Sequence, residues 1–127
     1  MVLLVRLLVV IIAMHAMLFS NPLWINNQTM DGYITGIGLS NDKDPVSKRI
    51  IATASARANL AESIKVEVKS HFKMLTQTHN DTHTTMTESI IKQKANEFLV
   101  GSFVKDTFQA DDGTLYILVV IKKSDMK

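Results

Sequence analysis

Alanine recurs at nearly every second position of the run ATASARANLA, residues 52–61. The run reads as a helix, and small side chains let a helix backbone lie close to whatever it packs on. It follows a segment containing Gly36 and Gly38, and it precedes two strongly apolar stretches near the C-terminus. The pattern constrains the architecture of the chain more than its activity.

Length and composition limit the classes of protein to consider. The 127 residues suffice for one compact domain. The net charge is +2, with 14 Lys and Arg against 12 Asp and Glu, and the basic residues are spread along the chain. No electrostatic footprint for nucleic acid is therefore present. Cysteine is absent, which excludes disulfides, thiolate chemistry and Cys-based zinc sites.

The N-terminus has the pattern of an export signal. Residues 1–6 form a short n-region carrying Arg6, and residues 7–19, LLVVIIAMHAMLF, form an apolar core. This length suits a signal peptide better than a membrane span of ~20 apolar residues. We expect residues 1–20 to be a signal peptide and residues 21–127 to be a single envelope domain, with the mature chain starting between Met17 and Asn21. An uncleaved N-terminal anchor is the alternative. Both place the domain outside the cytosol.

A strand and a long helix are expected in the first half of the domain. Residues 33–39 alternate between turn signals and predict a strand, whose glycines invite close backbone approach. Asp44 and Pro45 suit a helix start, and the helix is expected to run to about Lys73. Its predicted apolar face contains Val46, Ile50, Ala54, Ala58, Ala61, Ile64, Val68 and Phe72. Ala54, Ala58 and Ala61 should then face the sheet, so that Ala58→Leu would disrupt a tight contact.

The second half predicts a short helix and a hairpin. Residues 76–87 are rich in Thr and His and read as a loop, and a capping box at residues 85–88 starts a helix that ends near Gly101. Residues 103–109 and 114–122 read as strands joined by Asp111-Asp112-Gly113. The expected fold is α+β, with a small antiparallel sheet of about three strands, one long helix packed across it and a second short helix.

The last strand is apolar on both faces. Leu115, Ile117, Val119 and Ile121 point one way, and Tyr116, Leu118 and Val120 point the other. A strand of this kind is usually covered on both sides. We expect the long helix to cover one face, and the short helix or a neighbouring subunit to cover the other.

Four segments in this order resemble a known family. They are Pro22-x-Trp24, Gly36-x-Gly38, the alanine-rich run, and the hairpin ending in residues 116–121. Together they are similar to the Lpp-twenty lipoprotein family of Helicobacter and to the flagellar FlgP proteins, over residues 22–121. The resemblance implies a bacterial envelope domain with a long helix across an antiparallel sheet. It also implies membership among lipoproteins or flagellum-associated proteins near the outer membrane, some of which build rings or discs, and it implies no catalytic residues. The chain departs from the family in lacking the lipidated cysteine.

Few residues are candidates for metal binding or catalysis. His79 and His83, with Asp81 between them and His71 upstream, are weak candidates for a shared metal, but a solvated polar loop is the favoured interpretation. The carboxylates Asp106, Asp111 and Asp112 are better explained by the turn and by exposure to solvent.

Two isolated side chains have structural interpretations. A buried Arg57 would be costly, so it should reach the helix edge or pair with a carboxylate or with backbone carbonyls. Trp24 is expected to fasten the N-terminal segment onto the core. Neither a phosphate loop nor a nucleophile elbow is present in the sequence.

The favoured function is that of a non-catalytic envelope protein without a cofactor. It would act by self-association or by binding envelope or flagellar proteins. The alternative is a periplasmic small-ligand or metal-binding module that uses a cavity beside the sheet or the group of His71, His79 and His83.

Overall fold

The computed structural model describes residues 2–6, 21–27, 29–79 and 87–126, and within this part residues 2–6 are helical. The other elements are α2 (Leu23–Asn26), β1 (Tyr33–Ser40), α3 (Pro45–His79), α4 (Glu88–Leu99), β2 (Phe103–Gln109), β3 (Leu115–Lys122) and the 3-10 helix η1 (Lys123–Met126). The apolar core of the predicted export signal, residues 7–19, lies outside the described residues. The division of the chain at residue 20 therefore stays a prediction.

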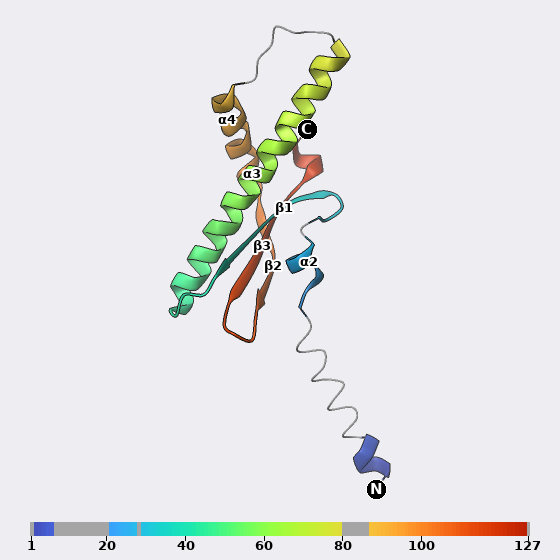
Figure 1. The fold of residues 1–127 in the computed structure, drawn as a ribbon, viewed down its shortest axis with the longest axis vertical. Helices are drawn as coiled ribbons and strands as arrows, with labels where there is room; N and C mark the ends of the chain where they lie inside the picture. The colour runs from blue at the N-terminus through green and yellow to red at the C-terminus, as the bar shows by residue number, and fades with distance from the viewer. Residues whose placement is uncertain (1, 7–20, 28, 80–86, 127) are drawn as a thin grey trace.

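The strands form one antiparallel sheet in the order β1-β3-β2, so β3 is central. Figure 1 shows the long α3 crossing this sheet diagonally. The turn between β2 and β3 is closed by Ala110 N donating to Thr114 O at 2.8 Å and by Gly113 N donating to Ala110 O at 2.9 Å. Gly113 has φ +90°, which a residue with a side chain rarely adopts. The predicted α+β class, strands and hairpin are confirmed.

Helix α3 begins where the sequence predicts. Asp44 caps it, because its Oδ2 accepts hydrogen bonds from the Ser47 backbone N at 3.0 Å and from the Ser47 Oγ at 2.9 Å. The helix continues to His79, a length of about 50 Å. The loop predicted from Thr76 is thus wrong for residues 76–79, which are helical, and residues 80–86 lie outside the described part.

The two glycines of β1 bring its backbone directly against the backbone of α3. A Cβ added at Gly38 would overlap the Ala52 carbonyl O and the Ala56 amide N, and one at Gly36 would overlap the Ala56 carbonyl O and the Leu60 amide N. The buried side of α3 is the series Ala52, Ala56, Leu60, Ile64 and Val68. The strand and the helix therefore meet without intervening side chains in the first half of α3.

The predicted face of α3 is wrong in its first half. Ala54 and Ala58 are exposed and Ala61 is only partly buried, whereas Ile64 and Val68 are buried as predicted. The contact follows one row of residues spaced by four, which drifts slowly around the helix. Alanine at every second position fits more than one such row, so the alanines alone do not select which row faces β1.

Helix α4 packs on α3 rather than on the opposite face of the sheet. Its buried residues are Ile91 and Ala95, and Ala95 joins the same core cluster as Leu60 and Ile64. Thr87 is the N-cap, with its side chain accepting from Ile90 N at 3.4 Å, so the helix starts two residues later than a capping box on residue 85 predicts. The predicted short helix exists, but it covers the face of the sheet that α3 also covers.

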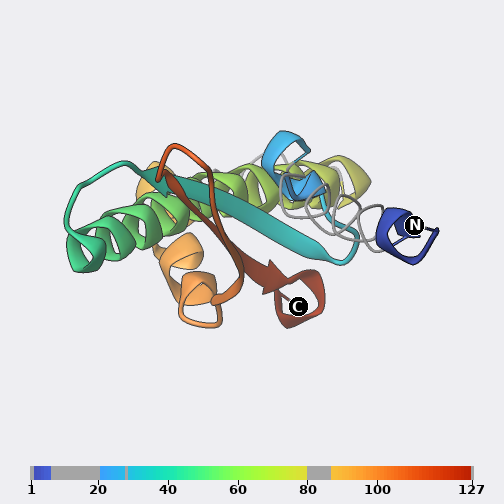
Figure 2. The same cartoon turned by 90° about the horizontal axis from the view of Figure 1, so that it is seen from below.

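The second face of the sheet is covered by the N-terminal segment of the domain. Trp24 on α2 clusters with the buried Leu118 and Val120, and Ile25 and Met30 pack against them. Figure 2 shows α2 (blue) and α4 (orange) on opposite sides of β1 (teal). The expectation that the short helix covers this face is wrong, and no neighbouring subunit is needed to bury Leu118 and Val120, because the chain covers them with residues of its own.

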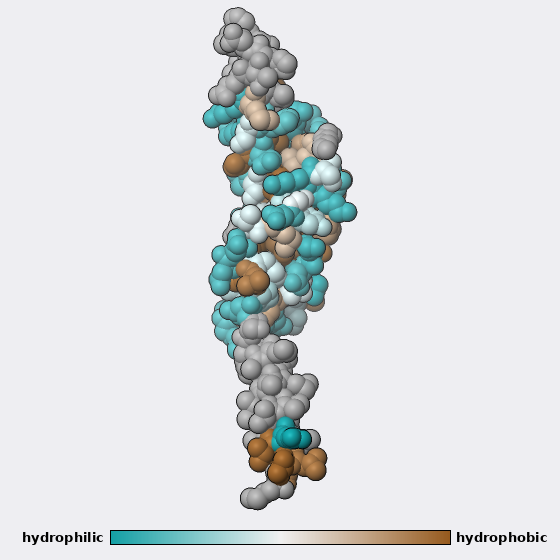
Figure 3. All heavy atoms as spheres, turned by 90° about the vertical axis from the view of Figure 1, so that its right-hand side faces the viewer, coloured by the Kyte–Doolittle hydropathy of each residue, from teal (hydrophilic) through white to brown (hydrophobic). Residues whose placement is uncertain are grey.

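The surface outside this core is mixed. On the side shown in Figure 3, apolar side chains form separate spots among polar ones, and near the N-terminus the exposed residues 2–5 form an apolar group. Among the residues that the structure describes, no helix is long and apolar enough to span a membrane.

Candidate interaction surfaces

Trp24 is held by a carboxylate from the far edge of the sheet. Its Nε1 donates to Asp106 Oδ2 at 2.8 Å, and the indole is only 8% exposed. A β-bulge in β2, between Val104 and Asp106, makes this contact possible. Phe103 lies opposite Val120 and Asp106 lies opposite Leu118, so both point to the face that carries Trp24. The predicted fastening role of Trp24 is in agreement with this geometry, whereas the partner residue was not foreseen.

The other candidate carboxylates belong to the hairpin turn. Asp112 Oδ1 accepts from the Thr114 backbone N at 3.0 Å, and this hydrogen bond holds the pKa of Asp112 below its usual value. Asp111 is exposed beside it. Lys48 Nζ donates to Gly113 O at 2.7 Å, which ties the start of α3 to the same turn. These groups stabilise the hairpin and do not converge with Asp106 on one site.

The histidines are only partly placed by the structure. His71 is exposed on α3, and His79 is the last residue of that helix. Asp81 and His83 lie outside the described residues. Within the described ranges, no group of three or more His, Asp or Glu side chains is arranged to hold a metal ion. The candidate pair His79 and His83 is therefore not tested.

Arg57 and Asn59 interrupt the alanine run for different reasons. Arg57 is exposed, so its charge stays in water and is not desolvated. Asn59 Nδ2 donates to Ile37 O at 2.7 Å and fixes the helix to β1. In the sequence, a lone amide in a run of small residues is the one signal for this hydrogen bond.

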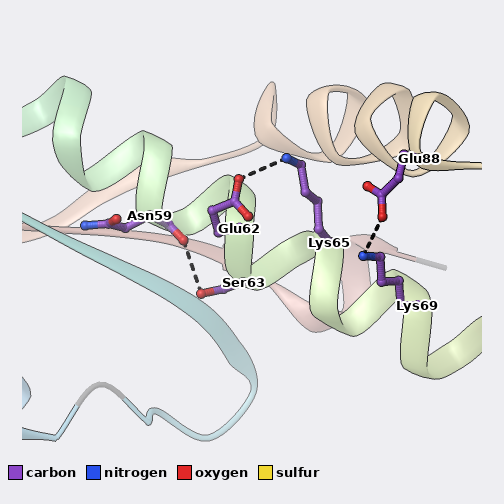
Figure 4. Close-up of polar contacts among 6 residues, drawn as sticks. All are labelled: Asn59, Glu62, Ser63, Lys65, Lys69 and Glu88. Atoms are coloured by element: carbon purple, nitrogen blue, oxygen red, sulfur yellow. Dashed lines mark hydrogen bonds and ion pairs between the residues drawn. The ribbon is translucent and has the colours of Figure 1, made fainter.

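An ion pair joins the two main helices. Lys69 Nζ on α3 lies 2.8 Å from Glu88 Oε1 at the start of α4, as Figure 4 shows. The hydrogen bond from Lys69 lowers the pKa of Glu88. A second pair, Lys65 with Glu62 at 2.9 Å, lies within α3. The Lys69–Glu88 pair is exposed to solvent and links α3 to α4, whereas in the pair within α3 Lys65 is partly buried and Glu62 is exposed.

Besides Val2, Leu3, Leu4 and Val5 near the N-terminus, exposed apolar side chains follow one another closely along the chain at two places in the domain. One, called here the helix strip, lies on the first half of α3 and consists of Val46, Ile50, Ile51, Ala54 and Ala58. The other, called here the edge patch, lies where α4 ends and β2 begins and consists of Val100, Phe103 and Val104. The exposed fractions are 68% for Val46, 62% for Ile50 and 46% for Ile51, and 82% for Val100, 41% for Phe103 and 47% for Val104. Apolar groupings of this kind often mark interaction sites.

A comparison with protein-family models matches most of the domain. A sequence model of the LPP20 lipoprotein family matches residues 22–122, from the residue before α2 to the last residue of β3. The match therefore includes Trp24, both glycines of β1, α3 and the hairpin. A search of curated proteins finds no match. The chain belongs to the LPP20 lipoprotein family.

Proposed function

We propose that the domain is a non-catalytic part of the bacterial cell envelope and acts through assembly. A lipoprotein family supports association with the envelope. The candidate polar side chains that the structure places support a role without turnover, because Asp106, Asp112 and Asn59 each hold part of the fold together. Association with a flagellar structure is the finer form of this proposal, and it rests on the resemblance to FlgP proteins.

The edge patch is the observation that carries the proposal. Val100 is 82% exposed at the end of α4, and Phe103 and Val104 follow it on the outer strand β2. Phe103 points to the Trp24 face and Val104 to the opposite face, since they lie opposite Val120 and Val119. Apolar side chains thus surround the start of a strand whose outer edge has no strand partner among the described residues.

The same strand limits how a partner attaches. The bulge after Val104 interrupts the ladder, and Lys105 and Asp106 place charges on the strand. Bulges and charges are features that prevent edge-to-edge pairing of sheets. A partner should therefore dock on the side chains of the edge patch rather than extend the sheet, and we propose a second copy of the chain as that partner.

Light scattering over a concentration series tests this proposal on the full chain. Self-association should weaken in a Val100→Ser/Phe103→Ser variant and persist in Val66→Ser, a matched control whose residue is 65% exposed on α3. The parent, the double variant and the control all contain residues 1–20, so a difference between them does not arise from that segment; because Phe103 also contacts the Tyr33 ring, circular dichroism must show that the double variant is folded. A parent chain that is monomeric at every concentration would contradict self-association. Stoichiometric metal uptake by that monomer, lost in His79→Ala, would favour the binding module instead.

A further inference from the structure

The helix strip is a second apolar surface, separate from the edge patch. Val46, Ile50, Ala54 and Ala58 are spaced by four residues, so they lie in one row along α3. Ile51 borders this row, and all five residues are exposed. The opposite side of the same helix half is the buried series that starts at Ala52 and Ala56. The strip therefore contributes nothing to the core, although it contains three large aliphatic side chains.

Within the helical segment that carries the strip, the charged side chains have one sign, and Glu62, which continues the row after Ala58, pairs with Lys65. Between residues 45 and 61 the helix contains Lys48, Arg49 and Arg57 and neither Asp nor Glu. Lys48 is bound to Gly113 O, which leaves the exposed Arg49 and Arg57. Arg57 follows Val46 by about three helical turns and lies on the side of the strip. Asp44 precedes the helix, and its carboxylate is occupied by Ser47.

The second half of α3 is different. There Glu62 and Glu67 accompany the lysines, Glu62 pairs with Lys65, and Lys69 pairs with Glu88 of α4. Helix α4 packs on this half, where Val68 is buried. This combination of exposed aliphatic and cationic side chains thus lies on the outward side of the half of α3 that packs on β1 and not on α4.

We propose that the helix strip docks on an anionic lipid surface. Aliphatic side chains flanked by arginines are the chemistry by which helices lie in the interface of a membrane with anionic headgroups. A second copy fits less well, because two strips face to face would bring Arg49 and Arg57 of both copies together without a carboxylate in the segment. The strip is short, so its binding should be weak, reversible and sensitive to salt.

Site-specific labelling tests the proposal, because the sequence contains no cysteine. The full chain carries Ile50→Cys with an environment-sensitive dye, and it is mixed with phosphatidylcholine vesicles with and without phosphatidylglycerol. The matched control is Val66→Cys, which is equally exposed on the same helix and lies nearly opposite to Ile50. Quenching by spin-labelled lipids reports which position enters the bilayer, whatever residues 1–20 do.

The dye at position 50 should be quenched only with phosphatidylglycerol present, and the dye at position 66 should not be quenched. Arg49→Gln and Arg57→Gln should each lower the docking equilibrium about fivefold at low salt. Equal quenching at both positions, or no dependence on phosphatidylglycerol, would overturn the proposal. The proposal would also be overturned if the dye at position 50 is not quenched by lipid and instead becomes shielded from water when the chain forms oligomers or binds an acidic protein. The Val100→Ser and Phe103→Ser changes should not alter the quenching of the dye at position 50. The test of lipid docking is therefore independent of the test of self-association.

Discussion

Replacing Gly38 by alanine tests how the helix and the sheet meet. The added Cβ would overlap the Ala52 carbonyl O and the Ala56 amide N, and it would lie 2.9 Å from the Ala56 Cα. Each of these atoms belongs to the helix backbone, so a change of side-chain rotamer cannot make room. The first half of α3 would have to move away from β1 by roughly an ångström to reach normal van der Waals separation.

The expected loss of stability is large for the addition of one methyl group. Overpacking of a core costs about 1–3 kcal/mol, and rigid backbone neighbours place Gly38→Ala near the upper value. The displacement also loosens the contacts of Leu60, a fully buried side chain on the face of α3 that meets β1. Alanine gains ~0.5–1 kcal/mol over glycine in a strand, which offsets only part of the loss. A loss of about 2–3 kcal/mol should lower the melting temperature by roughly 10–20 °C in a domain of this size.

Thermal unfolding followed by circular dichroism measures the effect, with Ala56→Leu and Ala58→Leu as a matched pair. Ala56 is fully buried against β1, so its leucine variant should melt well below the parent. Ala58 is exposed, so its leucine variant should stay within about 0.5 kcal/mol of the parent. A Gly38→Ala protein that melts with the parent, or an Ala58→Leu protein that melts with Ala56→Leu, would refute this account of the packing.

The other predictions concern the N-terminal segment and the carboxylates. Asp106→Ala should destabilise the domain by about 1 kcal/mol and shift the emission of Trp24, the only tryptophan, because its Nε1 loses its acceptor. In a double-mutant cycle with Trp24→Phe, additive losses of stability would show that the two side chains do not interact. Hydrogen bonds lower the pKa values of Asp44, Glu88 and Asp112 from 3.8, 4.5 and 3.8. Because folding lowers the pKa of each carboxylate, its ionised form stabilises the folded state at a pH above the unfolded-state pKa. This contribution to the free energy of unfolding is lost as the pH falls through the lowered, folded-state pKa. Urea unfolding at pH 6 and pH 3 should therefore show a smaller acid-induced loss in Lys69→Gln than in the parent, and an equal loss would contradict the role of the Lys69–Glu88 pair.

Local signals in the sequence suffice for most of the elements. The alternating residues of β1 and the continuous apolar run of β3 predict strands, and the hairpin follows from a glycine where the turn has φ +90°. Asp44 and Pro45 predict the start of α3 because a carboxylate cap and a proline in the first turn satisfy local requirements of the helix. The end of α3 is harder to predict, since residues 74–79 carry no apolar pattern that distinguishes a helix from a loop.

Contacts between distant residues explain what the sequence does not predict. The face of α3 depends on which row of alanines meets Gly36 and Gly38, and that choice is made by tertiary packing. Leu60 carries the best signal, because a large apolar residue four positions after Ala56 belongs to the buried row. The partnership of Trp24 with Asp106 depends on the bulge in β2, which turns Asp106 to the face that an uninterrupted strand would give to its neighbour.

Alanine at every second position makes the side of α3 that packs on β1 hard to predict from the sequence. It also gives the helix small side chains on both its inward and its outward side. In the first half of the helix, Ala52 and Ala56 meet the glycines of β1, and the equally small Ala54 and Ala58 are left facing outward beside Val46 and Ile50. A helix needed only for the core would gain solubility from polar residues on that outward side. Here the outward side keeps its aliphatic residues and adds arginines, while the half that α4 covers balances its charges with Glu62, Glu67 and Glu88. This difference between two halves of one helix is what a surface reserved for an external anionic partner requires, and packing of the domain alone does not account for it.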